Sequence, residues 1–177
     1  RRNAVVLLYL FGASPAVCSS FVAGHPHELL PLGEHTMHLP HATSLRMGRL
    51  GYQSDVQASL AVSYNSLESY AASLEEALTK PYPPYAAVGI QSLGGDYNQL
   101  AATLLQIENE FYGTIRPKRV SPDRPAKGLR QHGVEYIEMR LFDLNPMIDI
   151  GIAPEQGSFA DVLLLMCLFR DSPPISA

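Results

Sequence analysis

Residues 134–140 carry an alternating pattern of side chains that constrains the fold more than any other stretch of the sequence. A β-strand points successive side chains to opposite faces, so this alternation predicts a strand. One face would carry three polar or aromatic side chains, Tyr136, Glu138 and Arg140. The other would carry three apolar side chains suited to a core, Ile137, Met139 and Leu141. The pattern therefore predicts a sheet that sets a carboxylate beside a guanidinium.

Glu138 and Arg140 are open to two interpretations. A carboxylate can hold a metal ion while a neighbouring guanidinium grips a phosphate. The same two side chains could instead form an ion pair on a solvated sheet face, since exposed ion pairs are common. The strand alone leaves both interpretations open.

Residues 105–112 show a second alternation, which also predicts a strand. Its polar face would carry Gln106, Glu108, Glu110 and Tyr112. Carboxylates in line repel one another unless water, a cation or arginine compensates their charge. We expect the two acidic strands to lie antiparallel and to form the floor of a cation site. The basic cluster at residues 116–119 is expected to be a solvated turn.

Composition limits the class of protein. The 177 residues, 46% of them hydrophobic, suffice for one domain with a core and argue against disorder. The net charge of −4 argues against a nucleic-acid partner, because such partners favour basic surfaces. A membrane span needs about 20 apolar residues in a row, which this sequence lacks. Cys18 and Cys167 both stand among apolar residues, so we expect two buried free thiols in a reducing cytoplasm.

Two further segments have patterns that predict secondary structure. The apolar run from Ala4 to Phe11 is either the core of a secretory signal or an internal helix ending near Leu10. A capping-box-like start at Asn65 predicts a helix to about Thr79. Its buried face would comprise Leu67, Tyr70, Leu74 and Leu78.

The C-terminal third is expected to contain a loop and a helix. Residues 121–133 are polar and rich in proline and glycine, which predicts a mobile surface loop. The last helix should run from Phe159 to about Arg170. It is apolar nearly all round, so it should be buried by several partners.

Five of the six histidines lie between residues 22 and 41. They are His25, His27, His35, His38 and His41. Neutral imidazole is a common metal ligand, so a metal site is one interpretation. The spacings are irregular, however, and match no compact motif. We expect an exposed loop whose histidines do not converge on one point.

Six motifs in order and at matching spacing resemble the bacterial type of glutamate–cysteine ligase, over nearly the whole chain. They are residues 11–21, 42–46, 105–110, 115–119, 135–138 with Arg140, and 143–146. The resemblance continues through residues 11–21, which favours the internal helix over a secretory signal. It implies an α+β fold, part of a glutamine-synthetase-like catalytic domain with an antiparallel sheet and flanking helices. Residues 1–177 would then be an internal part of one catalytic domain.

The resemblance also implies an activity. Members of the family use ATP and magnesium to join the γ-carboxyl of glutamate to the amine of cysteine, the first step of glutathione biosynthesis. The implied partners are small molecules in the cytoplasm, namely glutamate, cysteine and ATP, with no nucleic acid and no membrane. The pattern defines no oligomeric state.

Five residues match functional positions of the family. Glu138 matches a magnesium ligand, and Arg140 matches the arginine that meets the transferred phosphate of ATP. Arg46, Tyr52 and Tyr112 match substrate-binding positions, and the two tyrosines would line the cysteine pocket. Glu108 and Glu110 lie in a family motif but receive no role.

The chain departs from the family at several points. It has Gly113 and Thr114 where relatives often have alanine and proline, and His132 and Phe142 also differ. An N-terminal acidic cluster of metal ligands and a later histidine ligand are absent from this sequence. The alternatives are therefore an inactive remnant or substrate-binding fragment, or a related carboxylate–amine ligase with another amine acceptor.

Overall fold

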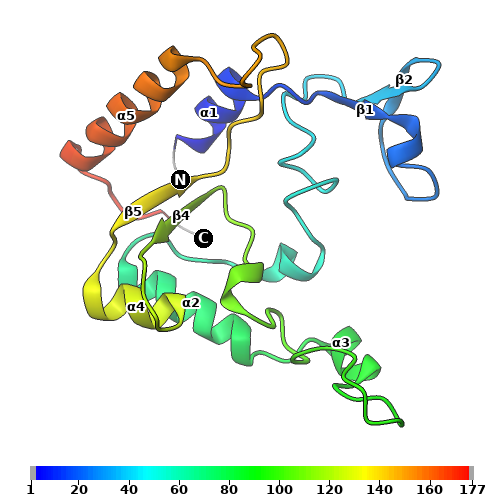
Figure 1. The fold of residues 1–177 in the computed structure, drawn as a ribbon, viewed down its shortest axis with the longest axis vertical. Helices are drawn as coiled ribbons and strands as arrows, with labels where there is room; N and C mark the ends of the chain where they lie inside the picture. The colour runs from blue at the N-terminus through cyan, green and yellow to red at the C-terminus, as the bar shows by residue number, and fades with distance from the viewer. Residues whose placement is uncertain (1–2, 176–177) are drawn as a thin grey trace. The chain divides into compact units, whose positions relative to one another are not determined.

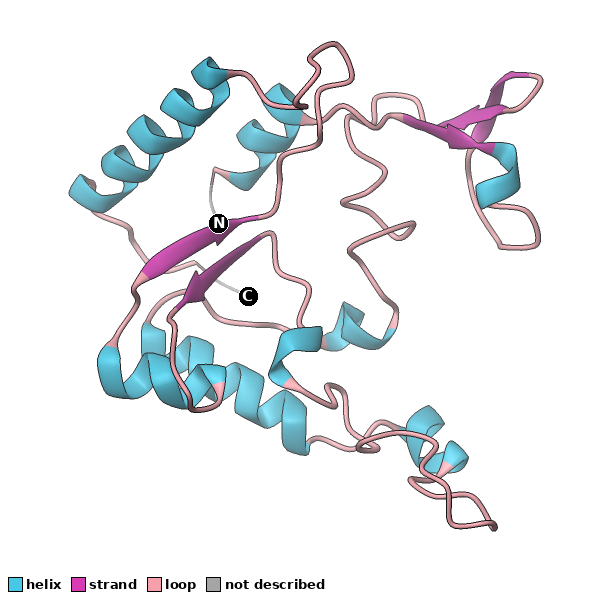
Figure 2. Ribbon diagram, in the orientation of Figure 1, coloured by secondary structure: helices cyan, strands magenta, loops and turns pink. Residues whose placement is uncertain are grey.

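The computed structural model describes residues 3–175, which fall into two compact units. Unit 1 contains residues 52–140 together with residue 175, and unit 2 contains residues 3–51 and 141–174. Both units combine helices with small antiparallel sheets (Figure 2). The α+β class predicted from the sequence is confirmed.

Unit 1 contains a two-stranded antiparallel sheet, two helices that lie together, and a third helix away from the sheet (Figure 1). The strands are β4 (Ile115–Lys118) and β5 (Tyr136–Met139), paired so that Arg116 lies opposite Glu138. The helices that lie together are α2 (Leu67–Thr79) and α4 (Pro125–His132), and the third helix is α3 (Pro83–Val88). Two single turns of 3-10 helix complete the unit, η2 (Val56–Ser59) and η3 (Glu108–Glu110).

The core of unit 1 forms where α2 and α4 pack together, side by side in Figure 1. Its buried members are Val62, Tyr70, Leu74, Ala77, Leu104, Leu105, Phe111 and Leu129. The predicted helix to Thr79 is confirmed, although Ser66 rather than Asn65 caps it by accepting a hydrogen bond from the Ser69 N–H at 3.0 Å. Tyr70 and Leu74 are buried as expected, whereas Leu67 and Leu78 are only partly buried.

Residues 121–133 do not form the loop that their composition predicts, because residues 125–132 are the helix α4. Pro125 occupies the first turn, where a missing N–H is harmless. The Glu108 carboxylate accepts a hydrogen bond from the Ala126 N–H at 2.6 Å and so caps the helix from a distant part of the chain. Ala126 and Leu129 bury the apolar side of α4. That cap cannot be read from the local sequence.

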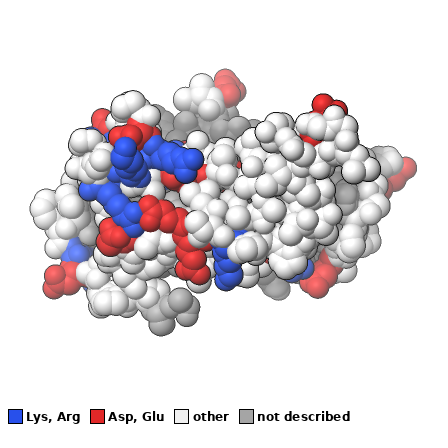
Figure 3. All heavy atoms as spheres, turned by 90° about the horizontal axis from the view of Figure 1, so that it is seen from below, with Lys and Arg blue, Asp and Glu red and all other residues white. Residues whose placement is uncertain are grey.

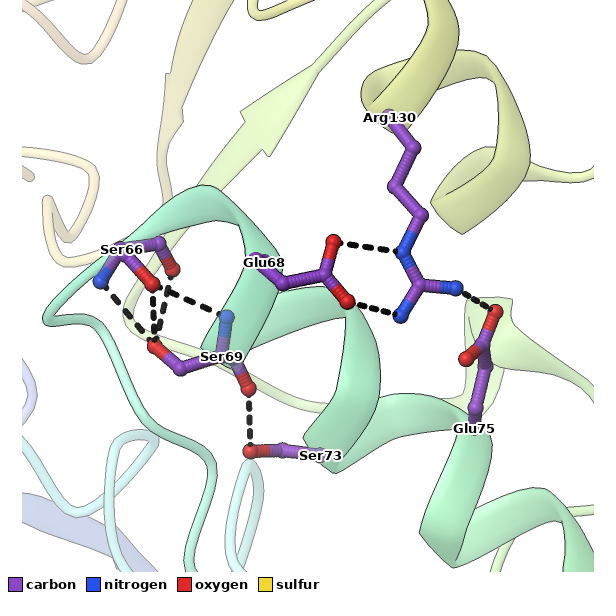
Figure 4. A network of polar contacts seen from close by, with 6 residues as sticks. All are labelled: Ser66, Glu68, Ser69, Ser73, Glu75 and Arg130. Atoms are coloured by element: carbon purple, nitrogen blue, oxygen red, sulfur yellow. Dashed lines mark hydrogen bonds and ion pairs between the residues drawn. The ribbon is translucent and has the colours of Figure 1, made fainter.

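Arg130 of α4 forms ion pairs at the surface with two glutamates of α2 (Figure 4). Its guanidinium donates two hydrogen bonds to the Glu68 carboxylate, at 3.0 and 2.7 Å, and a third to Glu75. Lys127 and Asp123 form a further ion pair at 2.7 Å. On the face shown in Figure 3, acidic and basic side chains likewise lie next to one another.

The second predicted strand, residues 105–112, is wrong. The chain makes the single turn η3 there, between extended residues at Ile107 and Phe111. Burial does not follow the alternation, because Leu105 is in the core but Ile107 of the same expected face is 44% exposed, and Glu108 of the opposite face is only 6% exposed. The carboxylates are compensated by backbone amides rather than by a shared cation, since Glu110 accepts the Gln106 N–H at 2.7 Å and Glu108 caps α4.

β5 therefore pairs with a strand that the sequence did not predict. Residues 116–119 were expected to be a solvated turn, but residues 116–118 belong to β4. Arg116 is only 5% exposed. The basic residues therefore belong to a strand, and Arg116 is a buried cation within unit 1.

Unit 2 contains a three-stranded antiparallel sheet and two long helices. The strands are β1 (Ala16–Cys18), β2 (Leu30–Gly33) and β3 (Thr36–His38), in the order β1-β3-β2. The helices are α1 (Ala4–Phe11) and α5 (Pro154–Phe169), with the short turn η1 (Ser19–Phe21). The apolar N-terminal run is thus a helix, and the Phe11 ring meets the Phe159 ring edge-on at 5.3 Å.

Helix α5 differs from its prediction in two ways. It begins at Pro154, five residues before the expected start at Phe159. Its apolar side chains are mostly exposed within residues 3–175, with Leu168 at 75% and Phe169 at 83%, and Ala160 is its buried residue. Burial by several partners is wrong for the described residues. Within residues 3–175, no helix is both long and apolar enough to cross a membrane.

The histidine segment and the cysteines also differ from expectation. Part of the expected loop is the hairpin β2–β3, in which His38 pairs with Leu30 and Ala16. No group of three or more His, Cys, Asp or Glu side chains suited to a metal occurs among residues 3–175. Cys18 and Cys167 are free as predicted, but both are exposed. Cys18 ends the edge strand β1, and the Cys167 Sγ atom in α5 accepts a hydrogen bond from the Asn3 side-chain amide at 3.5 Å.

Candidate active site

The end of β5 places Glu138 and Arg140 on one face of the sheet, as the period of two predicts. The Glu138 Oε1 and Arg140 Nε atoms lie 3.7 Å apart, and the two side chains are 34% and 24% exposed. The Arg140 N–H donates to the Thr114 carbonyl at 3.0 Å, which continues the β4–β5 ladder by one residue. The shared face is confirmed.

The apolar face of β5 does not form the expected core. Ile137 is 41% exposed, and Met139 is partly buried. Leu141 is fully buried but belongs to unit 2. The better-buried side of the sheet is the polar one, where Arg116 lies opposite Glu138 in the ladder.

A buried polar cluster lies beside Glu138. Arg116 Nη2 is 3.5 Å from the Glu108 carbonyl oxygen, and Arg116 also interacts with Tyr70, which is 3% exposed. Burial raises the pKa of the Tyr70 hydroxyl, and the positive charge of Arg116 acts in the opposite direction. The cluster therefore places a cation inside unit 1, next to the carboxylate expected to bind metal.

Glu138 has the chemistry of a metal ligand. Its Oε2 atom is buried without a hydrogen-bond partner among residues 3–175. A buried oxygen left in that state is costly unless a cation or water satisfies it. Carboxylate oxygen is also the donor that magnesium prefers. Glu138 thus fits a magnesium ligand, contributing one carboxylate of the several oxygen ligands that such an ion takes.

The two tyrosines expected at the cysteine pocket meet beside Arg140. The rings of Tyr52 and Tyr112 are 5.5 Å apart and pack edge to face at 77°. The Arg140 guanidinium lies over the Tyr52 ring, 5.1 Å from its centroid. Such a contact is favourable because the ring face is electron-rich. Unit 1 therefore brings together four of the five expected site residues.

The fifth expected residue, Arg46, belongs to unit 2. Its Nε atom donates to Asp143 Oδ1 at 2.6 Å, and its Nη2 atom donates to the Phe142 carbonyl at 2.8 Å. The Arg46 side chain remains 32% exposed. It lines a cavity of about 380 Å³ together with Ala13, Ser14, Phe142, Asp143 and Leu144.

Asp143 is the buried partner that fixes Arg46, with its side chain 4% exposed. Its Oδ2 atom accepts hydrogen bonds from the Ala13 N–H at 2.9 Å and the Ser14 hydroxyl at 2.7 Å. Burial pushes the pKa of the Asp143 carboxyl upward, but the hydrogen bonds from Ser14, Arg46, Ala13 and Ser44 outweigh it and hold the pKa below its ordinary value. Asp143 therefore stays ionised and aligned with Arg46.

Sequence reasoning missed three side chains that support these residues. They are Gln57, Arg116 and Asp143. Asp143 and Arg116 stand in motifs that match the family, yet nothing in the motifs indicates what they contact. Gln57 lies outside every motif and carries no signal in the sequence.

Comparisons with known proteins show the family to which the chain belongs. The family model described as glutamate–cysteine ligase matches residues 1–177. The glutamate–cysteine ligase of Pseudomonas aeruginosa (strain LESB58) is 50% identical over 175 residues, covering 98% of this chain and 33% of that protein. The ligase of Saccharophagus degradans is 51% identical over 179 residues, covering 99% of this chain and 34% of that protein.

A solved structure matches as well. The crystal structure of glutamate–cysteine ligase from Francisella tularensis in complex with AMP has a TM-score of 0.86 and 38% identity, covering 97% of this chain and 34% of that one. The fold is accordingly that of a ligase segment. The chain belongs to the glutamate–cysteine ligase family. It spans about a third of the length of the curated relatives it matches.

Proposed function

We propose that this chain forms part of an ATP-dependent enzyme that joins the γ-carboxyl of glutamate to the amine of cysteine. The observation that carries the proposal is the meeting of Glu138, Arg140 and the Tyr52–Tyr112 pair in unit 1. Family membership and the AMP-bound relative support it. In this proposal the enzyme acts on small molecules in the cytoplasm, as the first step of glutathione biosynthesis.

The chemistry requires activation of a carboxylate. Oxide is a poor leaving group, so ATP converts the γ-carboxylate of glutamate into a γ-glutamyl phosphate, which the cysteine amine then attacks. Arg140 would stabilise the charge that develops on the phosphoryl group during transfer. Its guanidinium is suited to this because two parallel N–H groups can meet two phosphate oxygens. The Tyr52 ring and Glu138 hold the guanidinium from two sides.

Glu138 would help to hold magnesium through its buried Oε2 atom. When bound, magnesium neutralises the β- and γ-phosphates of ATP. Glu138 has a second effect of its own, because its negative charge 3.7 Å from Arg140 orients the guanidinium across the sheet face.

The substrates would be held by the remaining expected residues. Tyr52 and Tyr112 would form the wall that positions the attacking cysteine. Arg46 suits a substrate carboxylate because its planar fork can engage both oxygens. Asp143 would keep that fork in one orientation, since it is buried and held by four donor groups.

The test uses a full-length enzyme that carries this sequence, assayed for ADP release with ATP, glutamate and cysteine. We expect ADP release to require both amino acids. Glu138→Gln should lower turnover by roughly a hundredfold to a thousandfold, since an amide holds magnesium far less well than a carboxylate.

Glu76→Gln is the matched control. Glu76 is an exposed carboxylate on α2 in the same unit, and this change should leave turnover unchanged. Near-normal turnover in Glu138→Gln would remove the metal-binding role of Glu138. ADP release that depends on an amine other than cysteine would instead indicate a related ligase.

A further inference from the structure

We propose that Gln57 is a positioning residue of the acceptor pocket, whose side-chain amide sets the place of Tyr112 against Tyr52. This inference rests on the proposed function, because it assigns the tyrosine pair to the cysteine substrate. It goes further by naming the side chain that determines the geometry of that pair.

The amide of Gln57 binds the backbone on both sides of Phe111, the residue before Tyr112. Its Nε2 atom donates to the Glu110 carbonyl at 2.7 Å, and its Oε1 atom accepts from the Tyr112 N–H at 3.1 Å. One planar group thus provides a donor and an acceptor to a segment that has no strand partner. The two bonds together fix the orientation of the amide, because a flipped amide would satisfy neither.

Gln57 is itself anchored to the core of unit 1. It lies in η2, where its own N–H is bonded to the Ser54 carbonyl at 3.1 Å. The neighbouring Val56 and Leu60 pack against the hydrophobic core. Tyr52 lies only five residues earlier in the chain. The amide therefore ties the segment that carries Tyr52 to the segment that carries Tyr112.

The segment around Tyr112 has little freedom on its other side. Phe111 is 7% exposed and belongs to the core, where its ring meets Tyr70. At Gly113 there is no room for a side chain, because a Cβ would lie 2.7 Å from the Tyr64 hydroxyl and 2.8 Å from the Phe111 ring. Tyr112 itself is 49% exposed. With Phe111 held in the core and the backbone held by Gln57, the Tyr112 ring is kept 5.5 Å from Tyr52.

A positioning role and a purely structural role differ in what they do to the kinetics. If Gln57 is a positioning residue, loss of its side-chain amide displaces Tyr112, which is one wall of the cysteine site alone. The KM for cysteine should then rise while the KM values for ATP and glutamate stay the same. A purely structural role would lower the fraction of folded enzyme, or would alter all three KM values together.

The experiment is Gln57→Glu in the full-length enzyme, with steady-state ADP release measured against each substrate. The substitution keeps the length of the side chain. It replaces the Nε2 donor by a carboxylate oxygen, which repels the Glu110 carbonyl oxygen because both are acceptors. We expect the KM for cysteine to rise by about tenfold to a hundredfold, the range caused by misplacing a binding group by about 1 Å. The KM values for ATP and glutamate should change less than about twofold. Gln57→Met, which removes both bonds without adding charge, should give the same split.

Gln99→Glu is the matched control. The Gln99 amide also donates to backbone carbonyls, those of Tyr85 at 2.6 Å and Gly89 at 3.0 Å, and lies away from the tyrosine pair in the chain. It should leave the KM for cysteine unchanged. Normal KM values in both Gln57 variants, or equal changes for all three substrates, would overturn the role of Gln57 while leaving the proposed function standing. A wild-type enzyme without cysteine-dependent ADP release would overturn both.

Discussion

At the scale of single residues, Asp143 links buried charge to the dependence of stability on pH. Its carboxyl pKa is lower in the folded protein than its ordinary value, so it stabilises the fold above the unfolded pKa of about 3.9 and loses that contribution as pH falls through the folded pKa. Replacing it with asparagine presents N–H groups to the donors that surround it.

We expect Asp143→Asn to destabilise a full-length enzyme by about 1–3 kcal/mol at pH 7, because a buried set of donors loses its charged acceptor. The difference from wild type should shrink as the pH falls below about 4, because the unfolded wild-type chain takes up a proton there, and it should be lost once the pH falls through the lower folded pKa. Thermal unfolding at several pH values measures this. A difference in Tm that is the same at pH 7 and pH 3 would contradict it.

For Arg140, the planar geometry of the guanidinium should matter for catalysis as well as its charge. Arg140→Lys retains one positive charge but cannot bind two oxygens in parallel or cover the Tyr52 ring in the same way. We expect kcat to fall by roughly a hundredfold to a thousandfold in full-length enzyme. Arg170→Lys, on an exposed arginine after α5, is the control and should have normal kcat. Normal kcat in Arg140→Lys would show that charge alone suffices.

The sequence could predict Glu138 and Arg140 as neighbours because a period of two fixes which side chains share a strand face. It could not predict the supporting contacts. Gln57 meets a segment more than 50 residues later in the chain, and Asp143 meets Arg46 across 97 residues. Such contacts depend on tertiary packing, which no local pattern encodes. The resemblance to the family implies which residues would contact substrate. It does not indicate which other residues hold those side chains in place.

At the scale of elements, α4 is held in two physically different ways. Leu129 is 2% exposed and packs in the core, whereas Arg130 forms ion pairs at the surface. We expect Leu129→Ala to cost about 2–5 kcal/mol, because it leaves a cavity. Arg130→Met should lower Tm much less, since pairs with exposed carboxylates are weak and screened by salt.

The dependence of stability on salt concentration distinguishes the loss of the ion pairs from the loss of core packing in α4. Thermal unfolding of a full-length enzyme at low and at about 1 M salt should show the loss in Arg130→Met disappearing while the loss in Leu129→Ala persists. Lys127→Met tests a neighbouring ion pair, within α4 and the turn before it, and should behave like Arg130→Met with a smaller loss. An Arg130→Met effect as large as that of Leu129→Ala at both salt concentrations would contradict this ranking.

The wrong predictions for α4 and η3 share one physical cause. Helix α4 and the turn η3 were misread because each depends on the other, through the hydrogen bond from the Ala126 N–H to the Glu108 carboxylate. A polar segment with proline and glycine looks like a loop when its cap lies 18 residues away. The alternation at residues 105–112 looks like a strand when its carboxylates are satisfied by backbone amides. Helix α2, whose cap and buried face are both local, was predicted to its last residue.

At the scale of the whole molecule, the fold combines exposed apolar helix surface with the metal ligand proposed at Glu138. Helix α5 exposes Leu168 and Phe169, and α1 exposes Val5 and Tyr9. Glu138 offers one carboxylate, and residues 3–175 contain no group of three or more side chains suited to a metal. The chain also spans only a third of the relatives it matches. Each of these features is expected of a segment that works within a longer ligase.

We therefore expect the polypeptide of residues 1–177 alone to release no ADP in the presence of ATP, magnesium, glutamate and cysteine. Magnesium takes about six oxygen ligands in near-octahedral geometry, and in the proposed site Glu138 would supply only one carboxylate of that set. A full-length enzyme that carries the same residues should be active under identical conditions at equal molar concentration. Circular dichroism on both polypeptides would establish that the shorter one retains helix, so that inactivity is not mistaken for unfolding. Ligation by the shorter polypeptide would mean that its site is complete, and that the remaining two-thirds of the relatives serve some purpose other than binding the metal.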